Sequence, residues 1–155
     1  SEIYITPTMR EVKELMESGC DMIALDMTHR RRPGGICAAD MVRLIHEAGV
    51  LVLADISTYE EGVAAQEVGA DAVSTTLSGY TAYSPSLAGP DIELVSRLSA
   101  ELSVPVFAEG RIGCPDDIVK VMAAGAFAPI VGSAITRPQL ITASFAAALD
   151  EGRQE

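Results

Sequence analysis

The chain has 155 residues, of which 48% are hydrophobic and 21% are charged, and its formal net charge is −11 at pH 7. This length suits one domain with a sizeable core, which can bury roughly 68–70% of the unfolded surface. The charge argues against a nucleic-acid-binding surface, because the chain has no basic stripe to neutralise phosphates.

Cysteine usage and hydropathy narrow the class of protein further. Cys20, Cys37 and Cys114 are odd in number, widely spaced and outside any C-x-x-C pair, so we expect free thiols in a reducing cytoplasm. His29 and His46 have no metal-ligand spacing with these cysteines, which predicts that no zinc site is present. No apolar stretch approaches the roughly 18 residues that span a bilayer, and the start of the chain lacks a signal-peptide pattern.

The chain opens with a short extended piece, residues 3–8, followed by a helix. Pro7 is expected to push Thr6 out of helical geometry. Thr8 and Glu11 have the spacing of a capping box, so the sequence predicts that the first helix begins directly after Thr8.

Apolar strands and amphipathic helices then alternate to the end of the chain, and this alternation predicts a parallel sheet with helices packed on it. Glycine closes a helix just before a strand in three similar segments, at 19–23, 69–73 and 125–129. The predicted strands are residues 22–26, 50–55, 72–76 and 104–109, and a last strand that contains Pro129 and ends at Gly132-Ser133. The predicted later helices are residues 39–48, 59–68, 91–102, 116–124 and 138–149, and the tail 150–155 is expected to fray.

Five full strands and the 3–5 stub are too few for a complete barrel. Right-handed crossovers allow either a closed barrel or an open doubly wound sheet. A closed (β/α)8 barrel usually takes roughly 250 residues. We therefore expect either an open sheet or most of a barrel whose first strands are missing.

The segment 104–112 carries the clearest chemical signal. An apolar strand ends in Glu109, and Gly110 and Arg111 follow directly. Functional groups of parallel α/β sheets collect where strands end and loops begin, so Glu109 lies where a proton-transfer group is expected. Gly110 lets a ligand approach the backbone, and the Gly132-Ser133 pair after the next strand offers further N–H groups. The two strand ends together predict a phosphate cradle.

Each of these assignments has a structural alternative. Glu109 alone is also explained as a strand-end carboxylate paired with Arg111, and Gly132-Ser133 as packing and a helix cap. Asp26 and Asp55 both end strands. For Asp26 we favour a cap or ion pair, and for Asp55 a substrate contact.

Two loops also allow two interpretations each. The basic cluster 30–32 is either a solvated loop or a part of the site mouth. Tyr80 and Tyr83 lie in the longest loop, residues 77–90, and are either a lid or surface aromatics.

Several segments together resemble one family. Ala54-Asp55-Ile56-Ser57-Thr58, the stretch 74–81, Ala108-Glu109-Gly110-Arg111-Ile112 and the stretch 131–138 are similar to segments of the N-acetylmannosamine-6-phosphate 2-epimerase family. The resemblance covers almost the whole chain in the right order. It implies a single domain, residues 1–155, that forms an incomplete (β/α)8 TIM barrel of the ribulose-phosphate-binding type. This chain would supply the last five βα units.

The resemblance also implies a reaction and its residues. Members of the family are isomerases of sialic-acid degradation that interconvert N-acetylmannosamine 6-phosphate and N-acetylglucosamine 6-phosphate, without metal or organic cofactor. A lysine and a glutamate act on opposite faces of C2 of the sugar. Proton removal from this carbon needs a base with a pKa near neutrality. By similarity, the roles are: catalytic, Glu109; substrate-binding, Asp55 and Arg137; phosphate-binding, Gly110, Arg111, Gly132 and Ser133.

One part of the family pattern is missing. The catalytic lysine of the family falls before Ser1, and the chain's two lysines, Lys13 and Lys120, lie in predicted helices. Loss of one acid–base group removes roughly 10²–10⁴-fold in rate, so we expect little or no turnover from these 155 residues alone. A homodimer is a further expectation from the family.

Two other functions stay open at this stage. One is a different phosphate-binding barrel enzyme, such as a pentose-phosphate epimerase or a lyase. The other is a non-catalytic partial barrel that pairs its open edges with another chain.

Overall fold

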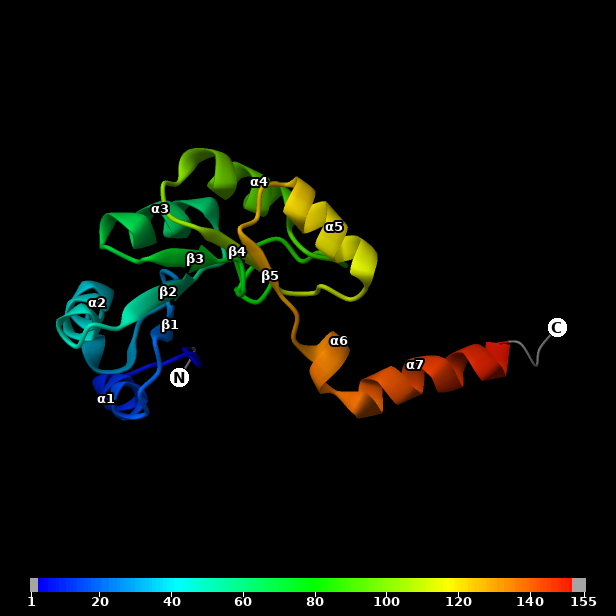
Figure 1. Ribbon diagram of the computed structural model, residues 1–155, viewed down its shortest axis with the longest axis horizontal. Helices are drawn as coiled ribbons and strands as arrows, with labels where there is room; N and C mark the ends of the chain where they lie inside the picture. The colour runs from blue at the N-terminus through cyan, green and yellow to red at the C-terminus, as the bar shows by residue number, and fades with distance from the viewer. Residues whose placement is uncertain (1–2, 152–155) are drawn as a thin grey trace.

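The fold is a curved, five-stranded parallel sheet with helices along its outer side, as Figure 1 shows. The computed structural model describes residues 3–151. The strands follow one another in chain order across the sheet, and all four pairings are parallel. They are β1 (Met22–Asp26), β2 (Leu51–Asp55), β3 (Ala72–Ser74), β4 (Val106–Glu109) and β5 (Ala128–Ile130).

A helix precedes each strand of the sheet. These helices are α1 (Met9–Glu17), α2 (Ala38–Glu47), α3 (Tyr59–Glu67), α4 (Ile92–Glu101) and α5 (Pro115–Ala123). Crossovers of one hand between strands in sequential order place every helix on the same side of the sheet. This arc of strands and helices is typical of (β/α)-barrel folds and differs from a doubly wound sheet, in which the strand order reverses.

The main hydrophobic core lies between the sheet and its helices. Val12 of α1, Ile45 of α2, and Leu25 and Val52 of the first two strands are fully buried in it. A smaller cluster packs α5 against β4 through Val121 and other apolar side chains. Burial of these apolar faces is the main source of stability for helices this short.

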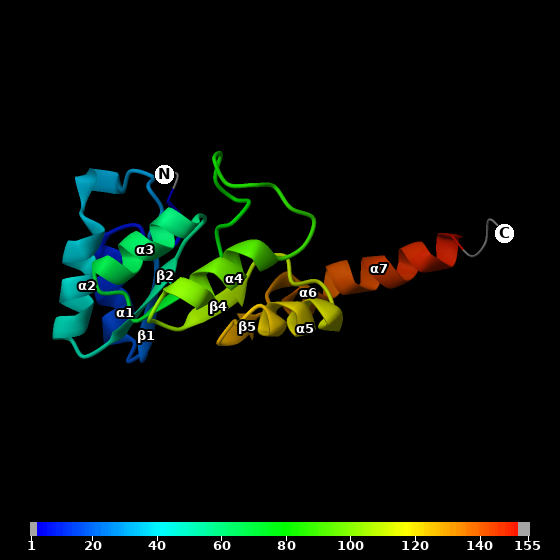
Figure 2. The same cartoon turned by 90° about the horizontal axis from the view of Figure 1, so that it is seen from above.

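The C-terminal helices leave this arc. The chain passes through α6 (Ser133–Thr136) into α7 (Pro138–Glu151), which projects away from the sheet in both views (Figures 1 and 2). Several of their large apolar side chains expose half of their surface or more: Ile135, Leu140, Phe145 and Leu149. Within residues 3–151, no helix combines the length and the hydropathy needed to cross a bilayer.

Most predicted elements are confirmed within a few residues, and the last strand needs a correction. It ends at Ile130, and Gly132 is the N-cap of α6, so Gly132 and Ser133 lie beyond the strand. Pro129 is tolerated inside β5 because β5 is an edge strand, where a missing N–H costs no ladder hydrogen bond on the open side. The predicted fraying of 150–155 falls mostly outside the described residues.

The start of the chain differs from the prediction in backbone conformation. Thr6 avoids right-handed helical geometry, but its φ of 43° is left-handed where we expected an extended residue. Two contacts hold it there. The Thr6 hydroxyl donates to the Ala24 carbonyl over 2.7 Å, and its own carbonyl accepts from Arg32 Nη1 over 3.0 Å. The capping box of Thr8 and Glu11 is confirmed.

Candidate active site

Acidic side chains mark the carboxyl ends of three strands. Asp26 ends β1, Asp55 ends β2 and Glu109 ends β4. Asp26 and Asp55 are register partners, and Ser74 of β3 is opposite Asp55 on the other side. Side chains alternate between the two faces of a strand, so residues in one register row point to one side. The acidic groups therefore gather on the side away from the helices.

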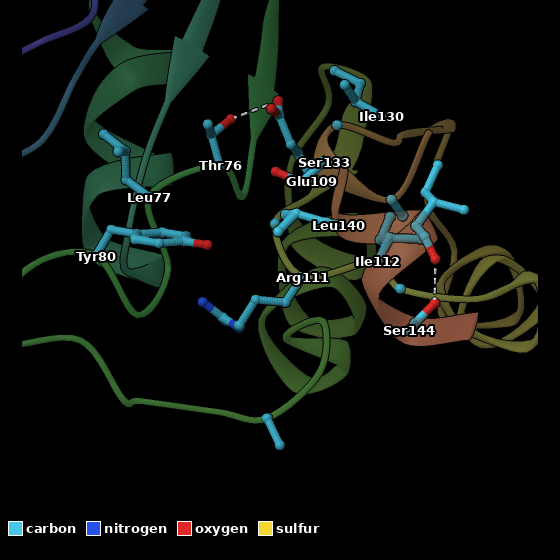
Figure 3. Close-up of a pocket in the computed structure, with 16 residues that line it drawn as sticks. Thr76, Leu77, Tyr80, Glu109, Arg111, Ile112, Ile130, Ser133, Leu140 and Ser144 are labelled. Atoms are coloured by element: carbon cyan, nitrogen blue, oxygen red, sulfur yellow. Dashed lines mark hydrogen bonds between the residues drawn. The ribbon is translucent and has the colours of Figure 1, made fainter. Parts of the chain in front are cut away.

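Four of these polar side chains form one connected set, the carboxyl–hydroxyl cluster: Asp55, Ser74, Thr76 and Glu109. The Thr76 hydroxyl lies 2.9 Å from Glu109 Oε2 and 2.7 Å from Ser74 Oγ, and it also contacts Asp55 Oδ1. The Ser74 hydroxyl donates to Glu109 Oε2 over 3.2 Å. Figure 3 shows the Thr76 hydroxyl directed at the Glu109 carboxyl group. Thr76 thus connects the two acidic groups.

Neighbouring Thr75 fixes the backbone of Glu109. Its hydroxyl accepts a hydrogen bond from the Glu109 N–H over 3.0 Å and donates to the Glu109 carbonyl over 2.9 Å. Glu109 is consequently held at two places, at its backbone by Thr75 and at its carboxyl group by Thr76 and Ser74. A carboxyl group held in this way would need little reorganisation before a proton transfer.

Asp55 has the most perturbed acidity in the site. Burial raises its pKa to about 7, and the negative charges of Glu109 and Asp26 add to the rise, while the hydrogen bond from Thr76 opposes it. Near neutral pH, Asp55 therefore changes between a hydrogen-bond donor and a pure acceptor.

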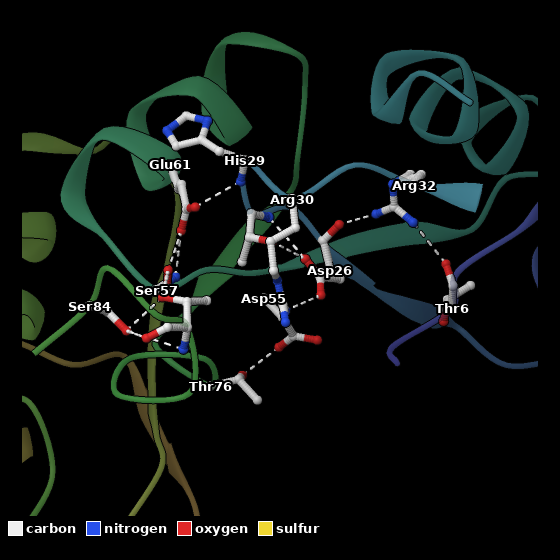
Figure 4. A network of polar contacts seen from close by, with 12 residues as sticks. Thr6, Asp26, His29, Arg30, Arg32, Asp55, Ser57, Glu61, Thr76 and Ser84 are labelled. Atoms are coloured by element: carbon white, nitrogen blue, oxygen red, sulfur yellow. Dashed lines mark hydrogen bonds and ion pairs between the residues drawn. The ribbon is translucent and has the colours of Figure 1, made fainter. Parts of the chain in front are cut away.

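Asp26 is bound by arginines of the following loop. Arg30 Nη2 lies 2.6 Å from Asp26 Oδ2, and the Thr28 hydroxyl donates to Asp26 Oδ1 over 2.6 Å (Figure 4). Arg32 is buried and donates to the Asp26 carbonyl. The ion pair expected for Asp26 is confirmed. The solvated-loop interpretation of residues 30–32 is wrong for Arg30 and Arg32, whose guanidinium groups hold the loop against β1.

A pocket of about 820 Å³ opens beside Glu109. It lies between the ends of β4 and β5, and α7 closes one side of it (Figure 3). Five of the predicted site residues line this pocket: Glu109, Gly110, Arg111, Gly132 and Ser133.

The other two predicted residues lie elsewhere. Asp55 does not line the pocket but is connected to it through Thr76. Arg137 is exposed at the junction of α6 and α7, and within residues 3–151 its side chain has no hydrogen bond or ion pair. The structure therefore brings five of the seven predicted residues together and connects a sixth.

Arg111 makes contacts that the sequence did not indicate. Its Nε donates to the Gly89 carbonyl over 2.9 Å and its Nη1 to the Ser78 carbonyl over 2.5 Å. Its guanidinium carbon also lies 5.5 Å from the centre of the Tyr80 ring. Arg111 thus holds both ends of the long loop 77–90, and these contacts replace the Glu109 ion pair considered as an alternative.

The other side of that loop is held by a residue the sequence analysis did not single out. Glu61 is fully buried at the start of α3 and accepts a hydrogen bond from the Tyr83 hydroxyl over 2.6 Å. It also accepts from the Ser57 hydroxyl (2.7 Å) and the His29 N–H (2.8 Å), as Figure 4 shows. Burial would raise its pKa, but these donors outweigh burial and lower it. The spacing of Thr58 and Glu61 is a capping-box signal from which the position could have been found.

No group of three or more His, Cys, Asp or Glu side chains in residues 3–151 is arranged to hold a metal ion.

Comparison with known proteins agrees with this geometry. Residues 1–151 match the family described as "Putative N-acetylmannosamine-6-phosphate epimerase". The chain belongs to this family. A "Putative N-acetylmannosamine-6-phosphate 2-epimerase" of Clostridioides difficile is 54% identical over 150 residues, which are 97% of this chain and 67% of the relative. A protein of the same description from Caldanaerobacter subterraneus is 51% identical and is covered to 64%.

A solved structure of the family has the same fold. The N-acetylmannosamine-6-phosphate 2-epimerase from Clostridium perfringens superimposes with a TM-score of 0.92 at 52% identity, over 96% of this chain and 65% of that one. This chain spans about two thirds of the length of its epimerase-family relatives. A thiamine phosphate pyrophosphorylase from Pyrococcus furiosus, at 19% identity and a TM-score of 0.60, shares the fold alone.

Proposed function

We propose that this chain is the acid–base and phosphate-binding part of an isomerase that interconverts N-acetylmannosamine 6-phosphate and N-acetylglucosamine 6-phosphate. Membership of the epimerase family supports the substrate. The observation that carries the proposal is the shared pocket, because a carboxyl group and the backbone of two glycine-containing turns line the same 820 Å³ space. The volume of this pocket falls within the usual range for small-molecule sites, so it can accommodate a sugar phosphate.

In this proposal Glu109 moves the proton at C2 of the sugar. Thr75 and Thr76 hold it at the rim of the pocket. Gly110 and Gly132, with Arg111 and Ser133, bind the phosphate, and the glycines leave the backbone open to it. Gly132 supports this role because a Cβ there would meet no heavy atom within 4 Å, so its backbone faces open space.

Asp55 and Arg137 are the proposed sugar-binding residues. Asp55 is buried behind Thr76, so it would act on the sugar from the floor of the site. Arg137 is exposed at the α6–α7 junction. Its role requires α7 to bring the junction to the pocket mouth, which α7 already lines through Leu140 and Ser144.

Epimerisation requires a second acid–base group on the opposite face of C2. Both lysines of the chain, Lys13 on α1 and Lys120 on α5, are exposed on the helical side of the sheet. We therefore propose that the second group lies outside these 155 residues, and that this polypeptide alone gives little or no turnover. We also propose that the five strands of this chain are those of the last five βα units of a TIM barrel.

The remaining proposals concern assembly and location. The exposed apolar side chains of α6 and α7, among them Ile135 and Phe145, favour a homodimer in which another copy covers them. The free thiols of Cys20, Cys37 and Cys114 favour a cytoplasmic protein.

Deuterium exchange tests the proposed chemistry directly. The 155-residue chain is incubated with each 6-phosphate in D₂O, and the C2 proton is followed by NMR. One base acting on one face predicts slow deuterium incorporation at C2 of one epimer, without conversion to the other. Replacement of Glu109 by glutamine should abolish this exchange. Rapid interconversion by the chain alone, or exchange that persists in E109Q, would contradict the assignment.

A further inference from the structure

The Thr76 hydroxyl lies within hydrogen-bonding distance of more oxygens than it can donate to. It has a single hydrogen, but three oxygens surround it: Asp55 Oδ1, Ser74 Oγ at 2.7 Å and Glu109 Oε2 at 2.9 Å. Thr76 can therefore donate its hydrogen to only one of the three oxygens. Each of the other two either donates a hydrogen to Thr76 or lies against it with no hydrogen between the two oxygens.

Counting hydrogens in the carboxyl–hydroxyl cluster shows what is missing. Four contacts join its members, but Ser74 and Thr76 supply only two hydrogens. With both carboxyl groups ionised, two of the four contacts would bring oxygens together without a hydrogen between them. This is unfavourable in a partly buried cluster in which Asp55 and Ser74 are fully covered. One added proton on either carboxyl group fills a third contact. The hydrogens then run in one direction, from Asp55 through Thr76 and Ser74 to Glu109, or in the reverse direction.

The charges around the cluster also favour one retained proton. Asp55 faces Glu109 from β4 and Asp26 from β1, and Arg30 forms its ion pair with Asp26. The Arg111 guanidinium is directed at the carbonyls of the long loop. Burial raises the pKa of Asp55 to about 7, which agrees with a proton held in the cluster at neutral pH.

We propose that Thr76 is a positioning residue that makes Asp55 and Glu109 a single proton-sharing unit. In the transfer, the Asp55 proton goes to Thr76 Oγ1, the Thr76 hydrogen goes to Ser74 Oγ, and the Ser74 hydrogen goes to Glu109 Oε2. Three O–H bonds break and three form, so one proton is transferred from Asp55 to Glu109 and one negative charge passes the other way. No other reactant is needed.

The consequence for catalysis rests on the proposed function, whereas the shared proton does not. If Glu109 exchanges a proton with the sugar, Asp55 would be the reservoir that restores the protonation state of Glu109. Thr76 would not touch the reacting carbon. It would set the direction of the Glu109 carboxyl group and the route of its proton.

A carboxyl titration tests the shared proton without substrate. The side-chain carboxyl carbons of Asp55 and Glu109 are followed by ¹³C NMR in the 155-residue chain from about pH 3 to pH 10. Groups that share a proton titrate in steps that belong to the pair, so each carbon should report both steps. In T76V only the through-space charge interaction remains, so the step of the partner in each curve should become clearly smaller. In T76S, which keeps the hydroxyl, both steps should remain at their full size.

Matched variants separate coupling from general damage. In T75V the lost hydroxyl belongs to the neighbouring threonine and contacts only the backbone of Glu109, so both steps should remain in both curves. In E109Q the Asp55 curve should contain a single step, which gives an independent test if T76V does not fold. Single-step curves in the unmodified chain, or coupling in folded T76V as strong as in the unmodified chain, would overturn the proposal. Absence of sugar-phosphate binding, with an intact shared titration, would count against the proposed function alone.

Discussion

Asp26 and Asp55 are direct register partners at the ends of β1 and β2, and both are buried, with 1% and 2% of their surface exposed. Like charges opposite one another on neighbouring strands are destabilising. The two carboxyl groups avoid this cost in different ways. Arg30 neutralises Asp26, whereas Asp55 binds the Thr76 hydroxyl and keeps its proton to higher pH.

The raised pKa of Asp55 predicts a pH dependence of stability. Between pH 4 and pH 7 the folded chain keeps the Asp55 proton and the unfolded chain releases it. Stability therefore falls as pH rises through this range and levels off above pH 7. A pKa change from 3.8 to about 7 corresponds to up to about 4 kcal/mol. Asp55→Asn should remove this component, and urea unfolding of both chains across the range measures the difference. A constant difference between the two chains at every pH would contradict the assignment.

The Asp26–Arg30 ion pair should be worth far more than a surface pair. Arg30→Met leaves a buried carboxylate without its neutralising partner, so we expect a loss of about 3 kcal/mol at pH 7. The matched control is Arg43→Met, which removes the exposed pair with Asp40 and should cost less than about 1 kcal/mol. Equal losses in the two variants would show that Arg30 lies in solvent.

Glu61 should stabilise the long loop more than an ordinary capping box does. Glu61→Gln puts an N–H₂ group against some of the donors that now surround the carboxylate, and we expect a cost of about 2 kcal/mol. Glu11→Gln changes the other capping box, which is solvent-accessible, and should cost less. Chemical unfolding measures both. Because the Glu61 pKa is lowered, its contribution should be present above about pH 4.5 and should be lost as pH falls further.

Arg111 should control the mobility of the loop 77–90. Gly79 has a φ of 80°, and a Cβ there would lie 2.4 Å from Arg111 Nη1, so Gly79→Ala should both strain the turn and displace the guanidinium. Arg111→Met removes the two carbonyl contacts without changing the turn. Hydrogen exchange of loop amides should become faster in both variants. Unchanged exchange in Arg111→Met would show that the loop is held without this residue.

The sequence predicted those features of the fold that depend on residues close to one another in the chain. Alternating strands and helices predicted all five strands, and the Thr8–Glu11 spacing predicted the first capping box. The order of strands and the position of Glu109 beside Gly110 and the Gly132-Ser133 turn also followed from the pattern and the family resemblance. These features depend on neighbours in sequence, or on rules that hold for every parallel α/β sheet.

Contacts between distant residues could not be predicted in the same way. Thr76 is 21 residues from Asp55 and 33 from Glu109, and only the strand register brings the three together. The sequence left two interpretations of the arginine cluster open, because the contacts of Arg30 and Arg32 with the oxygens of Asp26 form only in the folded chain. The turn after β5 was predicted as the end of the strand because apolar Ile130 and Val131 lead directly into it, although a short helix follows Gly132.

The central claim is that Glu109 faces a sugar whose phosphate is bound by the backbone at Gly110 and Gly132. It is tested most directly by adding N-acetylmannosamine 6-phosphate to the ¹⁵N-labelled chain and following the amide signals, with inorganic phosphate and unphosphorylated N-acetylmannosamine as controls. The account predicts saturable shifts of the Gly110, Gly132 and Ser133 amides with both phosphate compounds, and additional shifts at Glu109 and Thr76 with the sugar phosphate alone. Saturable binding that leaves the amides of Gly110 and Gly132 unchanged would contradict it.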